Sequence, residues 1–144
     1  MQNFTARIAT LVQEAKHLGN EELAIRQEFL NKSSRCVRDT IKPRADILLN
    51  FCKQLEDVSA TYKGNENQDS EVYGQVSLQQ GNDKRVIKFT FDREAKRCRV
   101  AETINNAAPP EMSLEVENID AKFVEEILEK VFSAFIHKEI TTSY

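Results

Sequence analysis

The spacing of apolar residues changes twice along this chain. Up to about residue 60 they recur every three or four positions, from about residue 72 to 118 at every second position, and from residue 120 every three or four again. The first and last spacings are typical of amphipathic helices, and the middle one of half-buried strands. The pattern predicts an α+β fold in a single domain over residues 1–144.

The helical region, residues 1–60, divides at Gly19-Asn20, two residues that tolerate the left-handed conformation and are typical of a helix end. We therefore expect an N-terminal helical hairpin. A first apolar stripe consists of Phe4, Ile8, Leu11, Val12, Ala15 and Leu18. The second consists of Leu23, Leu30, Val37, Ile41, Ala45, Leu48, Cys52 and Leu55, at nearly heptad spacing.

The second helix, residues 21–58, contains Pro43, which predicts a kink or break near Ile41-Lys42. Unbroken, this helix would be about 57 Å long at its rise per residue. A compact domain of this size has a diameter near ~40 Å. Either the helix bends, as one kinked helix or two, or its overhang contacts a second copy. A kink in the helix and a contact with a second copy are compatible with each other.

Residues 61–71 are polar and aperiodic, and they predict a surface loop. Four alternating segments follow at residues 72–80, 84–92, 97–103 and 112–118, which predict a four-stranded antiparallel meander with one apolar face. A C-terminal helix, residues 120–137, carries a wide apolar stripe behind the N-cap Asp120. We expect this helix and residues 43–58 to lie together on the apolar face. Residues 1–41 then have no obvious place on the sheet.

Composition excludes some classes. The net charge is −3 with 30% charged residues, so the strongly basic total of many nucleic-acid binders is missing. Three widely spaced cysteines form neither a disulfide framework nor a zinc motif. The start of the chain lacks the basic and apolar regions of a signal peptide, and no apolar run approaches membrane-spanning length. We expect a cytoplasmic protein that holds neither a metal nor a cofactor.

The first candidate site is the apolar stripe at the start of the second helix, which has no predicted place on the sheet. Leu23, Leu30, Val37 and Ile41 would be an adhesive patch if they were exposed together. They are the predicted partner-binding residues. The preferred function is therefore a non-catalytic protein–protein interaction or assembly module that forms a homodimer, or binds a protein partner, through its N-terminal helices.

A basic ridge gives the alternative function. Its cations are Lys32, Arg35, Arg38, Lys42 and Arg44, and one acidic residue, Asp39, lies among them. Such a ridge can neutralise phosphates, which is the main source of non-specific nucleic-acid affinity. The plainer interpretation is a solvated helix face, and no aromatic residues interleave with the cations to stack on bases.

Catalysis has little support. The two histidines, His17 and His137, have no triad-like neighbours in the sequence. The adjacent carboxylates Glu56-Asp57 and Glu125-Glu126 diverge on a helix surface. A small enzyme or ligand carrier with a pocket between the sheet and its helices is the third interpretation.

Overall fold

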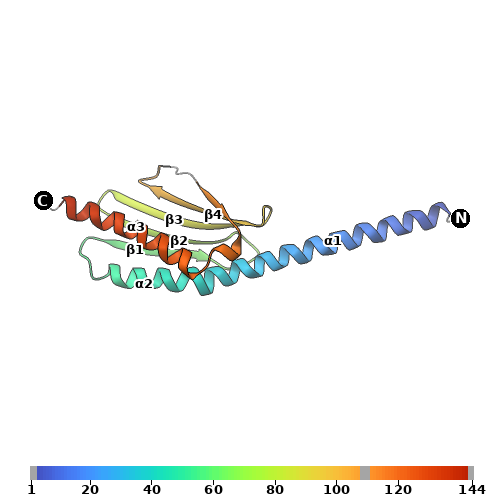
Figure 1. Ribbon diagram of the computed structural model, residues 1–144, viewed down its shortest axis with the longest axis horizontal. Helices are drawn as coiled ribbons and strands as arrows, with labels where there is room; N and C mark the ends of the chain where they lie inside the picture. Colours follow the sequence, from blue (N-terminus) through green and yellow to red (C-terminus); the bar gives the residue numbers. More distant parts are fainter. Residues whose placement is uncertain (1–2, 108–110, 143–144) are drawn as a thin grey trace.

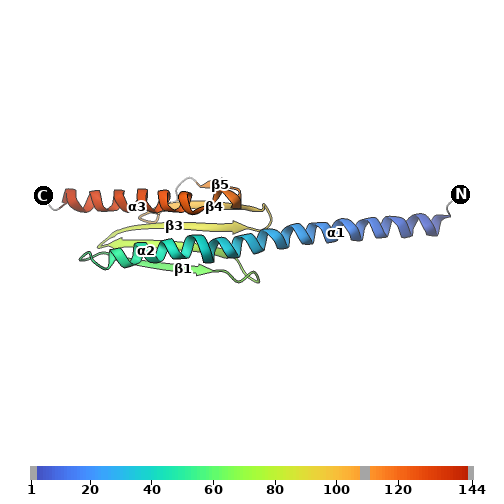
Figure 2. The ribbon, with the colours of Figure 1, turned by 60° about the horizontal axis from the view of Figure 1, so that its bottom comes forward.

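A computed structural model describes residues 3–107 and 111–142 of this protein. Five antiparallel strands form one sheet in sequence order. They are β1 (Ser59–Asn65), β2 (Val72–Gln80), β3 (Asp83–Asp92), β4 (Arg97–Ile104) and β5 (Met112–Leu114). Helices α2 (Lys42–Cys52) and α3 (Ala121–Thr142) lie side by side on one face of this sheet (Figures 1 and 2). The predicted α+β class, with helices on one face, is confirmed.

The N-terminal helix does not turn back on itself. Helix α1 runs from Phe4 to Arg35 and continues through a π-helical turn, η1 (Cys36–Ile41), into α2 (Figure 1). The predicted hairpin at Gly19-Asn20 is therefore wrong. Among the described glycines only Gly81 has a positive φ, so Gly19 keeps helical geometry. A glycine inside a helix costs only about 1 kcal/mol, which the helix formers on either side offset.

The predicted disturbance near Ile41-Lys42 takes the form of the π-helical turn. The Lys42 N–H donates to the carbonyl of Val37, five residues back, and Pro43 occupies the first turn of α2. A proline there needs no N–H donor and has a suitable φ. Residues 4–52 are thus one helical path with a local change of pitch, and the helix ends at Cys52 instead of residue 58.

The sheet has five strands where the sequence predicts four. Residues 59–65 form β1, which pairs with β2 from Ser59–Gln79 to Asn65–Tyr73. It lies at the sheet edge, where polar residues are tolerated, and so it lacks the alternation that identifies β2 and β3. The last strand is shorter than predicted, because a 3-10 turn, η2 (Val116–Asn118), follows β5 and directs Val116 into the core.

The core lies between the inner face of the sheet and the helices. The Phe123 N–H donates to the Asp120 carboxylate at 2.9 Å, as predicted for an N-cap, and α3 extends beyond its predicted end to Thr142. Gly74 of β2 allows close approach of η1, because a Cβ at this position would lie 3.0 Å from Ile41 Cγ2. Fully buried large side chains include Val72, Val76, Leu78, Ile87, Phe89, Val124, Val131 and Phe135.

The three free thiols, Cys36, Cys52 and Cys98, are all buried in this core. Burial raises the pKa of Cys36 and of Cys98 to about 12, because a thiolate would be desolvated there. Unfolded thiols titrate near ~8.5, so above that pH the unfolded state holds fewer protons than the native state. The contribution of the buried thiols to stability is therefore fully present below the pKa of an unfolded thiol. It is lost as pH rises towards the pKa of the folded state.

We expect the free energy of unfolding, measured with urea, to fall between about pH 8 and about pH 11. The half-buried Tyr62 contributes in the same direction, since desolvation also raises its pKa to about 12. Cys98→Ala is the control and should flatten the pH dependence. A urea midpoint that is constant over this range would contradict the burial of these thiols.

Candidate functional site

The structure separates the four predicted partner-binding residues. Leu30, Val37 and Ile41 are buried in the core of the same chain, whereas Leu23 is 64% exposed. The interpretation of these four as one exposed patch is therefore wrong, because η1 and the end of α1 pack on the sheet. Ile41 lies directly over Gly74.

Most of the exposed large apolar side chains lie further towards the N-terminus. From Asn3 to Glu28 every described residue is exposed or half-buried, and Phe29 is the first buried one. Before Ile25, this part of α1 projects past the end of the sheet, with no other described element alongside it (Figures 1 and 2). Residues 4–25 correspond to a rod about 33 Å long.

The projecting segment carries a heptad repeat, which we name the α1 seam. Starting at Phe4, the steps alternate strictly between four and three residues, as in the a and d positions of a coiled coil. Each large apolar side chain of the seam is more than 40% exposed. The seam consists of Phe4, Ile8, Leu11, Ala15, Leu18, Glu22 and Ile25.

The α1 seam is continuous with the side of the helix that contacts the sheet. At 3.6 residues per turn, the buried residues Phe29 and Ser33 fall within about 30° of the mean seam direction, whereas Leu23 is about 110° away. The seam ends at a groove of about 290 Å³, lined by Ile25 and Phe29 of α1 and by residues 95–97 and 115–117. A helix lying along the seam would thus meet the end of the sheet.

Polar contacts hold α1 in place at this junction. Arg26 pairs with Glu94 of the β3–β4 turn at 3.3 Å, and Lys32 pairs with Glu117 at 2.7 Å. The Gln27 amide donates to Gln68 at 2.6 Å. The projection is therefore anchored from its base by both apolar and polar contacts.

The sequence places five of the seven seam residues in its first apolar stripe, but none of them is among the predicted partner-binding residues, and the stripe omits Glu22 and Ile25. The division at Gly19-Asn20 ended the first stripe at Leu18 and started a second one at Leu23. Continuing the four–three alternation through Glu22 reaches Ile25 and then Phe29, which is the signal that could have found it.

The predicted basic ridge is largely neutralised by carboxylates of the same chain. Lys32 pairs with Glu28 as well as Glu117, Arg38 with Asp39 at 2.8 Å, and Arg44 with Glu125 at 3.3 Å. The neighbouring Arg38 guanidinium lowers the pKa of Asp39. Arg35 and Lys42 are exposed. Nucleic-acid binding stays a prediction, with two cations of five outside these ion pairs.

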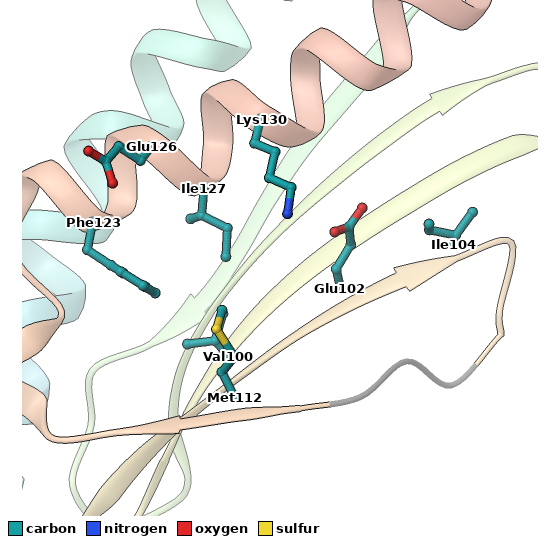
Figure 3. A pocket seen from close by; sticks show the side chains of 8 residues that line it. All are labelled: Val100, Glu102, Ile104, Met112, Phe123, Glu126, Ile127 and Lys130. Atoms are coloured by element: carbon teal, nitrogen blue, oxygen red, sulfur yellow. The ribbon is translucent and has the colours of Figure 1, made fainter.

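A groove of about 480 Å³ lies between α3 and the β4–β5 edge (Figure 3). Val100, Met112, Phe123 and Ile127 line its apolar part, and the side chains of Glu102 and Lys130 both point towards it (Figure 3). Among the described residues that line it there is no histidine, cysteine or serine. Over residues 3–107 and 111–142, no group of three or more potential metal ligands is brought together. His17 is exposed on α1 and pairs with Glu21 at 3.1 Å, while the side chain of His137 lies outside the described residues.

The chain matches no protein-family model, and no curated protein or solved structure is significantly similar to it. Among the described residues, none of the helices combines the length and apolar character needed to cross a membrane. The α1 seam is the candidate functional site, because its large apolar side chains are exposed together on a helix that projects beyond the sheet.

Proposed function

We propose that this protein is a non-catalytic assembly module that joins another polypeptide helix through a coiled coil formed by the α1 seam. The observation that carries the proposal is a heptad of large apolar side chains on a helix that projects alone beyond the sheet. Burying a large apolar side chain fully is worth about 1.5–3 kcal/mol, so this seam has a strong tendency to be covered.

The marginal stability of single helices supports the same proposal. An isolated helix of this length is marginal in water, and Gly19 weakens it further. A partner helix would supply the tertiary contacts that the projecting segment lacks. The three unpaired thiols suit the reducing cytoplasm, where we propose that the protein acts.

Weak self-association is the form of this proposal that can be tested without a second protein. In sedimentation equilibrium we expect the apparent mass to rise above the 16.5 kDa monomer as the concentration enters the high micromolar range. The helical circular dichroism signal should rise over the same concentrations, because pairing stabilises α1. A constant monomer mass with constant helicity would contradict self-association.

A further inference from the structure

We propose that the preferred partner of the α1 seam is a basic amphipathic helix of a different protein, with a lysine or arginine facing Glu22 and a bulky apolar residue facing Ala15. This inference rests on the proposed coiled coil and specifies its partner. It follows from the two positions at which the seam departs from a regular apolar core.

Glu22 is the first departure. It occupies an a position of the heptad, between Leu18 and Ile25, and is exposed in the isolated chain. In a parallel pair of copies Glu22 would face the same residue of the partner, and in an antiparallel pair it would face an apolar residue. The first arrangement places two like charges in one layer, and the second leaves a carboxylate desolvated and unpaired. A partner lysine or arginine at this layer removes both penalties.

Ala15 is the second departure. It occupies an a position where Ile8 stands one heptad earlier. Two copies in parallel would bring two alanines together, which underfills that layer of the interface. A larger apolar side chain from the partner would fill it.

Along the middle of the seam the flanking charges have the same sign as Glu22, while nearer its ends Arg7 occupies a g position and Arg26, which pairs with Glu94, occupies an e position. Glu14 and Glu21 occupy g positions, and the e and g positions from Val12 to Glu21 include no basic residue. Lys16 and His17 lie at b and c positions, away from the seam. Charges at e and g select the partner of a coiled coil, so this acidic stretch favours a basic helix and disfavours a second copy.

Two synthetic peptides of about four heptads test this inference. Both have leucine at a and d, apart from one central a position. The basic peptide has lysine at that position and at e and g, and the acidic peptide has glutamate at all of them. We measure binding to the full-length chain by isothermal titration calorimetry, with a scrambled basic peptide as the control for non-specific charge attraction.

We expect the basic peptide to bind at least ~10-fold more tightly than the acidic and scrambled peptides, equivalent to about 1.4 kcal/mol. The triple variant Glu14→Gln, Glu21→Gln, Glu22→Gln should lose most of this selectivity. These residues are exposed, so the variant keeps its fold.

The outcomes separate the partner inference from the proposed function. Equal binding of the basic and acidic peptides overturns the partner chemistry but leaves the coiled coil standing. Self-association without binding of either peptide also overturns the inference, and makes a second copy the occupant. If neither peptide binds and the chain stays monomeric, both proposals fail.

Discussion

Replacing Leu18 with lysine is expected to abolish association through α1 while leaving the folded domain unchanged. Leu18 is 60% exposed in the single chain, so its substitution removes no core contact. In a two-stranded coiled coil it becomes a buried d residue, where lysine would place a charge between apolar layers. We expect calorimetry to show binding of the basic peptide weakened by at least ~100-fold, or about 2.7 kcal/mol, and sedimentation to show no rise in apparent mass with concentration.

Leu23→Lys is the matched control. Leu23 has nearly the same exposure as Leu18, at 64%, and lies on the same helix, but at a b position away from the seam. The substitution makes the same change in charge and helix propensity. If both variants weakened association equally, the seam would not be the contact surface.

Ile41→Ala should have the opposite effect, destabilising the domain without altering the seam. Ile41 is fully buried, and it lies over Gly74 at the π-helical turn. Truncating a buried isoleucine to alanine costs about 2–5 kcal/mol from lost burial and the remaining cavity. Urea denaturation should show a loss of this size, while the native variant still binds the basic peptide.

The control for this substitution is Ile47→Ala on α2. Ile47 is 57% exposed, so its truncation should change the free energy of unfolding by no more than about 0.5 kcal/mol. An Ile41→Ala protein as stable as the wild type would contradict the placement of η1 on the sheet. It would also restore Ile41 as a candidate partner contact.

The parts of the fold that sequence predicts well are those where burial sets the pattern. The alternation of Ile87, Phe89 and Phe91 identifies β3, and the stripe behind Asp120 identifies α3, because each element has one face in the core. Strand β1 escapes prediction because it is an edge strand with few apolar residues. Its existence depends on pairing with β2, which is a non-local interaction.

The candidate site was predicted only in outline. An apolar stripe shows that a helix face is covered but not what covers it, so the stripe predicts a partner for Leu30 and Val37, which are buried in the core of the same chain. Gly19-Asn20 resembled a helix end because local propensity is a weak constraint within a long helix. That one error divided the seam, and with it the link between Leu18 and Ile25.

The uninterrupted passage of α1 through η1 into α2 has a mechanical consequence. No loop separates the projecting segment from the sheet, so once a partner stabilises this segment as a helix, a force applied near Phe4 would be transmitted to the contact between Ile41 and Gly74. A partner bound to the projecting segment would therefore fix the orientation of the β-sheet domain as well as its distance from the partner. Gly19 is the single glycine along this projecting segment.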